Sequence, residues 1–304
     1  MMNEGEYIMT TVNFNAKTGN YEAKVGKRTI SSYSEAYVKR QLKKMAPALE
    51  QAAKKEAEMD NRFDINTRFD FVEKLVNMVA SGVQASAVIT GEGGLGKTYT
   101  VRKTLEKAGL EDMTALLEEA EEGDVIDNGY ITIKGFSTAK GLYRTLYENN
   151  GKIVMFDDCD SILKDPVALN ILKGALDSYD KRYISWNSEM KESDDLPRSF
   201  EFTGQIIFIS NMDQDKIDQA VRSRSMMIDL SMTEDQKIDR MEHIALNDEF
   251  LPEYDAEIKT DALNLLREIK DDVKEISLRT LIAVSKIRDS NTDWKDLATY
   301  MLTA

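Results

Sequence analysis

Short, almost wholly apolar segments alternate with longer amphipathic segments between residues 86 and 230. The short segments read SAVIT, GYITIK, IVMF, QIIFIS and SMMIDL, and apolar residues recur at helical spacing in the segments between them. Strands that are apolar on both faces and separated by helices are typical of a parallel sheet that helices cover on both sides. The pattern therefore predicts an α/β core.

The two ends of the chain follow other patterns. Residues 11–30 alternate weakly around a Lys-Thr-Gly-Asn turn signal and predict a hairpin. Residues 34–59 contain few helix breakers and predict a helix that Pro47 kinks or splits. After Leu230 the pattern is helical to the end. The expected domains are a hairpin and basic helix extension over 1–60, the α/β core over 61–230, and a small helical domain over 231–304.

Composition excludes several classes of site. The 304 residues include a single cysteine, Cys159, and a single histidine, His243. An intrachain disulfide, a zinc site built on these residue types and a histidine-based catalytic triad are therefore not expected. There is neither a long uncharged apolar run nor a basic start followed by an apolar block, so we expect a cytoplasmic protein without a membrane span.

Charge is distributed unevenly along the chain. The net charge is −14. Between Lys24 and Lys55, nine basic residues stand against Glu35 and Glu50, so this segment carries +7 and the remainder −21. The basic segment could contact nucleic acid, or it could be a solvated helix face that docks on the acidic remainder.

A glycine-rich motif, Gly91-Glu92-Gly93-Gly94-Leu95-Gly96-Lys97-Thr98, lies between the segment SAVIT and a predicted helix. It fits the phosphate-binding loop G-x-x-x-x-G-K-[ST]. Glycines allow backbone N–H groups to curl around phosphate oxygens, and the helix N-terminus adds its positive dipole end. We expect Lys97 to reach the β- and γ-phosphates and Thr98 to offer its hydroxyl to Mg²⁺.

Polar residues end two of the apolar segments. Asp157 and Asp158 follow IVMF, where the first would hold Mg²⁺ and the second would polarise the attacking water. The alternative is a pair of solvated acids. Asn211 follows QIIFIS, where it could orient that water or contact the γ-phosphate, or simply cap a strand or turn.

Three arginines are further candidates. Arg222 and Arg224, in the segment AVRSRS, could point out of the subunit and stabilise charge on a neighbour's γ-phosphate, or form surface ion pairs. Arg279 lies in the apolar run ISLRTL and needs an anionic partner, either a nucleotide phosphate or a nearby acid.

Together, these motifs resemble those of the AAA+ ATPase family over about residues 66–304. GEGGLGKT is similar to its Walker A motif, IVMFDD to Walker B, IIFISN to sensor 1, AVRSRS to the arginine-finger segment and LRTL to sensor 2. The family implies a five-stranded parallel sheet, a C-terminal helical lid, and a homo-oligomeric ring, usually of six, with ATP at the subunit interfaces.

The resemblance also implies residue roles. Thr98 and Asp157 would support Mg²⁺, Asp158 would be the catalytic base, Asn211 sensor 1, Arg224 the finger in trans and Arg222 a second finger or structural contact. The implied nucleotide contacts are Gly91, Glu92, Gly93, Gly94, Leu95, Gly96, Lys97, Thr98, Tyr99 and Arg279. The family usually has Glu at the position of Asp158. A shift of about 1 Å in a catalytic group can cost on the order of 100-fold in rate, so we expect slow hydrolysis.

Three hypotheses remain for what the protein acts on. Phe136, after a predicted strand, could grip unfolded polypeptide in a pore or be a core residue, and residues 181–203 predict a hairpin with an acidic tip. A protein-remodelling ATPase is slightly favoured. The alternatives are a nucleic-acid-handling loader or helicase that uses the basic segment 24–55, and an assembly switch in which nucleotide drives no motor.

Overall fold

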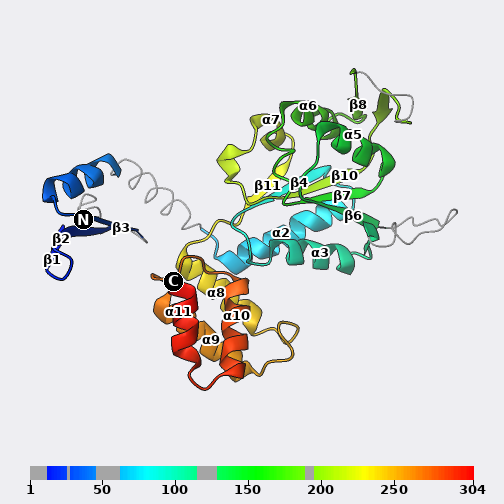
Figure 1. Cartoon of the computed structure of the whole chain (residues 1–304). Coiled ribbons are helices and arrows are strands. Elements are labelled where there is room, and N and C mark those ends of the chain that lie inside the picture. The colour runs from blue at the N-terminus through cyan, green and yellow to red at the C-terminus, as the bar shows by residue number, and fades with distance from the viewer. Residues whose placement is uncertain (1–11, 26–27, 46–61, 115–128, 189–194) are drawn as a thin grey trace. The chain divides into compact units, whose positions relative to one another are not determined.

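The computed structural model describes residues 12–25, 28–45, 62–114, 129–188 and 195–304 (Figure 1). The chain divides into two compact units. One is Phe63–Met232, and the other combines Met1–Arg62 with Thr233–Ala304.

A parallel sheet of six strands forms the centre of the unit Phe63–Met232. Its order is β11-β4-β10-β7-β6-β5, and every neighbouring pair is parallel. The strands are β4 (Ser86–Thr90), β5 (Glu111–Asp112), β6 (Gly129–Lys134), β7 (Ile153–Asp157), β10 (Gln205–Ile209) and β11 (Met226–Asp229). The α/β prediction is confirmed, but the count of five strands was wrong. The additional strand, β5, has only two residues, both acidic, and therefore gives no apolar signal.

Helices cover both faces of this sheet (Figure 1). They are α2 (Ile65–Ala80), α3 (Lys97–Lys107), α5 (Ala139–Glu148), α6 (Pro166–Ala175) and α7 (Gln219–Arg222), with a 3-10 turn η2 (Gln214–Lys216). Contacts join α2 to α3 and α5 to α6. The N-terminus of α2 is capped by Asp64, whose carboxylate accepts from the backbone N–H of Thr67 at 3.0 Å. The helix therefore begins close to the expected start of the α/β core at residue 61.

The hairpin predicted over residues 181–203 is present. Its strands, β8 (Tyr183–Ser185) and β9 (Ser199–Glu201), are antiparallel. Trp186, just beyond β8, lies 5.8 Å from the ring of Tyr143, which also contacts Phe200 at 5.3 Å. This aromatic cluster attaches the hairpin to α5.

The N-terminal segment forms a three-stranded antiparallel sheet followed by a helix. The strands are β1 (Asn13–Asn15), β2 (Asn20–Val25) and β3 (Arg28–Ser32). The predicted hairpin is thus present with one more strand. The helix runs over residues 35–45, and the rest of the helix predicted around Pro47 lies outside the described residues.

Four helices follow residue 232, in agreement with the helical pattern. They are α8 (Glu234–Ala245), α9 (Ala256–Ile269), α10 (Leu278–Ser290) and α11 (Trp294–Thr303), and each packs on the next. Trp294 is buried at the start of α11, with the guanidinium of Arg288 5.6 Å from its ring centre. No helix within the described ranges is long and apolar enough to cross a membrane.

Candidate functional site

The residues singled out by the sequence meet at one edge of the sheet. β4 pairs with β10, and β10 pairs with β7, all in parallel. The loop Gly91–Thr98 leaves β4, Asp157 ends β7, and Asn211 follows β10. Because parallel strands end at the same edge, segments more than 50 residues apart in sequence converge there. The crevice outside these carboxyl ends is where open α/β sheets bind ligands.

The loop needs glycine at its first position. Gly91 has φ 133°, and an added Cβ would lie 2.8 Å from the carbonyl carbon of Leu230 and 2.9 Å from its oxygen. Gly96, the N-cap of α3, has φ 95°. A Cβ at position 91 would therefore push the loop away from Leu230. With glycine there, backbone groups can line the space that the loop surrounds.

Lys97 is held inside this loop. It is 5% exposed, and its Nζ donates to the carbonyl oxygens of Gly91 at 2.8 Å and Glu92 at 2.6 Å. A third bond, of 3.0 Å, goes to Asn211 Oδ1. Burial lowers the pKa of Lys97 from its ordinary value, while the carboxylates of Asp158 and Asp157 raise it and partly offset this effect. The lysine is a cation enclosed by oxygen acceptors at the place where the sequence predicts phosphate binding.

A hydroxyl and a carboxylate lie side by side next to the lysine. Thr98 Oγ1 donates to Asp157 Oδ1 at 2.8 Å, and Asp157 is buried. Its other oxygen, Oδ2, lies 3.3 Å from Nζ of Lys134, the last residue of β6. Sequence spacing alone does not indicate this partner. The signal is the register of the two strands, which sets Lys134 opposite Asp157.

The donor set suits one class of metal ion. Within the described ranges, no group of three or more His, Cys, Asp or Glu side chains is arranged to hold a metal. Mg²⁺ is usually bound through one or two carboxylates, a hydroxyl, waters and substrate phosphates rather than by a full protein cage. Thr98 and Asp157 fit such an ion.

Asp158 faces a different partner from Asp157. Its side chain is exposed, and its backbone has φ 57°, in the left-handed region. Asn211 Nδ2 donates to Asp158 Oδ1 at 2.7 Å while Asn211 Oδ1 accepts from Lys97. The amide therefore links the buried cation to the exposed carboxylate.

Cys159, the next residue, is buried. Its Sγ lies 3.3 Å from the carbonyl oxygen of Ile133, and burial raises its pKa to about 11. A thiol that remains protonated at neutral pH has little nucleophilic character.

The two candidate finger arginines lie away from this edge. The carbonyl oxygen of Arg224 accepts a 3.4 Å bond from Ser86 Oγ, and Ser86 begins β4, whereas the phosphate loop follows the end of β4. Arg224 is half-buried, with Nη1 donating to Ala220 O at 3.2 Å. Arg222 is exposed and lies 4.0 Å from Asp215. Neither arginine belongs to the cluster that Lys97, Thr98, Asp157, Asp158 and Asn211 form in the same unit.

Other candidate residues have simpler surroundings. Leu95 is fully buried beneath the loop, whereas Glu92 and Tyr99 are exposed. Arg279 is exposed in the first turn of α10, in the other unit. Phe136 is 81% exposed after β6, so the interpretation of Phe136 as a core residue was wrong.

Comparison with known proteins gives a relative in a bacteriophage. No protein-family profile matches the chain. It is 30% identical over 266 residues to an uncharacterized 36.7 kDa protein of the nrdC–mobD intergenic region of Enterobacteria phage T4. The match covers 81% of this chain and 76% of the phage protein. The chain belongs to the family of this phage protein.

Solved structures of similar shape include mutant forms of RuvB from Thermotoga maritima. One has a TM-score of 0.46 at 12% identity and covers 80% of this chain and 72% of that one. Another has a TM-score of 0.46 at 13% identity, covering 78% and 69%. In this chain the phosphate loop, the acid-ended strand and the asparagine-ended strand lie next to one another in one parallel sheet.

Proposed function

We propose that this chain is a Mg²⁺-dependent ATPase that works as a ring of identical subunits, most simply six. The observation that carries the proposal is the cluster at the sheet edge. There, Lys97 is buried among oxygen acceptors, Thr98 pairs with Asp157, and Asn211 pairs with Asp158. A structural salt-bridge cluster would not need a glycine loop whose first Cβ is excluded by Leu230.

The chain's own groups divide into binding and catalytic roles. The loop residues from Gly91 to Gly96 and the N-terminus of α3 would bind phosphate oxygens through backbone N–H groups, with Lys97 exchanging its carbonyl partners for phosphate. Thr98 and Asp157 would hold Mg²⁺, which supplies charge neutralisation for the phosphates when bound. Glu92, Tyr99 and, from the helical unit, Arg279 are proposed as further contacts to the nucleotide.

Asp158 is the proposed general base. Its carboxylate is exposed, so it can accept a proton from a water molecule, and the 2.7 Å bond from Asn211 fixes one of its oxygens. Asn211 also contacts Lys97. We infer that Asn211 holds the carboxylate of Asp158 and the ammonium group of Lys97 in fixed positions relative to each other.

The position of Arg224 supports assembly. This residue lies at the edge of the sheet opposite the phosphate loop, so in the proposed ring it would act on the nucleotide of a neighbouring subunit. An arginine supplied in trans stabilises charge on the transferred phosphoryl group. Arg222 is proposed as a second contact across the same interface.

The substrate of the motor is a macromolecule. Phe136 is exposed next to Gly135, which has φ 81°, and both follow β6 at the same sheet edge as the nucleotide cluster. An exposed aromatic in a loop beside the site supports the gripping of an unfolded polypeptide. The second candidate, a nucleic acid, is favoured by Lys39, Arg40, Lys43 and Lys44, which are exposed on the N-terminal helix.

The proposal is tested by Lys97→Ala. We expect ATP turnover to fall by about 100-fold or more, since the buried cation is removed, whereas Lys164→Ala, an exposed lysine on the same unit, should leave it unchanged. Turnover unaffected by Lys97→Ala would contradict the ATPase assignment. ATP-dependent assembly without measurable turnover would favour the assembly switch.

The same assay separates the two substrates. Stimulation by an unfolded polypeptide that Phe136→Ala abolishes would identify a protein. Salt-sensitive stimulation by single-stranded DNA that Lys43→Glu and Lys44→Glu abolish would identify a nucleic acid.

A further inference from the structure

The N-terminal segment contains a depression of its own, separate from the nucleotide cluster. It is open to solvent, has a volume of about 800 Å³ and lies between the three-stranded sheet and the helix over residues 35–45. The residues that line it include Asn20, Ser31, Ser32, Tyr33, Tyr37 and Arg40. Its volume lies within the range of about 300–1,000 Å³ that is usual for ligand pockets.

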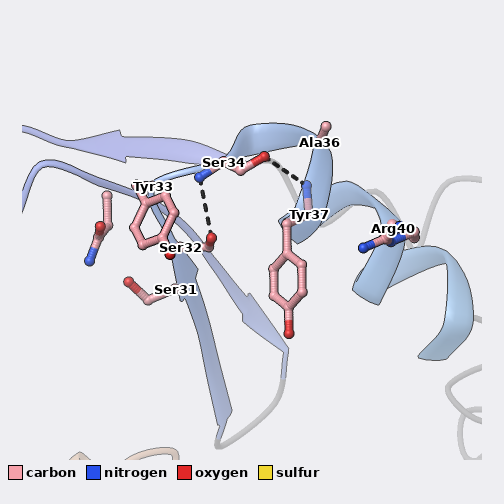
Figure 2. Close-up of a pocket in the computed structure, with 8 residues that line it drawn as sticks. Ser31, Ser32, Tyr33, Ser34, Ala36, Tyr37 and Arg40 are labelled. Carbon is pink, nitrogen blue, oxygen red and sulfur yellow. Dashed lines mark hydrogen bonds between the residues drawn. The ribbon is translucent and has the colours of Figure 1, made fainter.

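Local hydrogen bonds hold the turn that carries the first aromatic residue. The backbone N–H of Ser34 donates to Ser32 Oγ at 3.2 Å, and that of Tyr37 donates to Ser34 Oγ at 3.3 Å (Figure 2). Ser34 thus caps the helix. Tyr33 lies between these bonded residues, so its backbone is fixed before any ligand binds.

Two tyrosines present their rings to solvent around the depression. Tyr33 is 88% exposed and Tyr37 is 42% exposed. Arg40, one helical turn after Tyr37, places its guanidinium 5.8 Å from the centre of the Tyr37 ring (Figure 2). Exposed aromatic faces combined with arginine are the elements on which unpaired bases stack.

Positive charge continues from this site along the helix. Arg40, Lys43 and Lys44 are exposed. Two acids lie nearby, but Glu35 forms an ion pair with Lys39 at 2.6 Å, and Glu22 accepts bonds from Thr18 and Ser31. Arg40, Lys43 and Lys44, which follow Lys39, therefore outnumber the acidic residues on this face.

We propose that this surface, formed by Tyr33, Tyr37, Arg40, Lys43 and Lys44, binds single-stranded nucleic acid. Tyr33 and Tyr37 stack on bases, Arg40 and the two lysines contact the phosphates, and the hydroxyl and amide groups at the base of the depression add polar contacts. Binding here does not depend on ATP hydrolysis at the other site.

A protein partner fits the surface less well. Ala23 and Val38 are fully buried, and Ala36 is the single aliphatic residue among those that line the depression. The depression therefore offers aromatic faces, hydroxyls and cations but no large aliphatic anchor, whereas many protein interfaces are centred on large buried anchors in pockets. A single-stranded nucleic acid, whose planar bases are separate and are joined through phosphates, matches this arrangement.

The experiment uses the full-length chain and a fluorescent 20-residue oligothymidine, with binding followed by anisotropy in the absence of nucleotide. Tyr33→Ala and Tyr37→Ala should each weaken binding by about 5- to 150-fold, the loss of one stacked base. Tyr33→Phe and Tyr37→Phe keep the ring and should retain most of the affinity. Tyr179→Ala, at an exposed tyrosine of the other unit, is the matched control and should have no effect.

The charged part of the surface has its own readout. Lys43→Glu with Lys44→Glu should weaken binding and reduce the slope of affinity against salt concentration. Affinity unaffected by both tyrosine changes would overturn the proposal. So would poly-glutamate that binds as tightly as the oligonucleotide and depends on the lysines alone, because it would identify a surface for acidic proteins. Lys97→Ala should leave oligonucleotide binding intact, which separates this inference from the ATPase proposal.

Discussion

The unusual acid at position 158 is explained by its backbone. Asp158 has φ 57°, and left-handed backbone is several-fold enriched in Asn and Asp among non-glycine residues. A short polar side chain fits this conformation better than the longer Glu that AAA+ proteins usually have there. The short acid at position 158 thus suits the left-handed backbone found there.

Asp158→Asn separates charge from shape at this position. Asn also tolerates positive φ, so the fold and ATP affinity should be retained, while turnover should fall by about 100- to 10,000-fold because the general base is lost. Turnover and binding of a fluorescent ATP analogue are the measurements. Asp160→Asn, which removes a carboxylate two residues away, should keep most of the activity. Equal losses in both variants would indicate an electrostatic effect of the acidic segment rather than a base.

Gly91 sets the geometry of the loop by a steric constraint. Gly91→Ala should lower the free energy of unfolding by about 2–4 kcal/mol, because its Cβ would overlap the Leu230 backbone at an unfavourable φ. Urea unfolding measures the change. Gly109→Ala, where φ is +81° but the surrounding space is open, should cost only about 1 kcal/mol. Similar costs in the two variants would show that backbone conformation alone matters.

The register between β6 and β7 places the loop that carries Phe136 next to the proposed metal site. Lys134 ends β6 and lies 3.3 Å from Asp157, and Gly135 and Phe136 follow it directly. An ammonium group at this carboxylate would compete with a divalent cation held by Asp157. A bound cation would thus weaken the ion pair of the residue that precedes Gly135 and Phe136.

Lys134→Met tests this competition. The Mg²⁺ concentration that gives half-maximal ATPase activity should fall by about two- to fivefold, a small change because the lysine is largely exposed. Mg²⁺ titrations of steady-state turnover are the measurement, with Lys164→Met as the control. An increase in the required Mg²⁺ concentration would mean that Lys134 supports the site instead of competing for it.

The phosphate loop and the proposed arginine finger lie at opposite ends of β4. The phosphate loop leaves its carboxyl end, and Arg224 lies beside its first residue. Under the proposal that Arg224 acts in trans, one subunit lacks a complete catalytic set and activity requires assembly.

Mixing two inactive variants tests the shared site. Arg224→Ala should lower turnover by about 1,000-fold or more, and Lys97→Ala should also abolish it. An equal mixture should regain about one quarter of wild-type turnover if subunits assort at random, because some interfaces then pair an intact loop with an intact arginine. No recovery after confirmed mixing of subunits would place Arg224 outside the catalytic interface.

The sequence predicted the parts whose signals are local. β4, β7 and β10 are apolar on both faces, and the phosphate loop has a fixed spacing, so the site's main residues could be found without coordinates. The two acidic residues of β5 carry no such signal. The pairing of Lys134 with Asp157 depends on strand register, and the strain at Asp158 depends on φ, neither of which spacing encodes.

The two tryptophans of the chain fall in different units, Trp186 beside the hairpin of the α/β unit and Trp294 at the start of α11. This distribution provides an intrinsic optical label for each half. With Trp294→Phe, the remaining indole emission reports on the nucleotide-binding unit alone, and with Trp186→Phe it reports on the helical unit. The order in which the two halves melt, and which of them ATP protects, can thus be recorded on the intact chain without an attached dye.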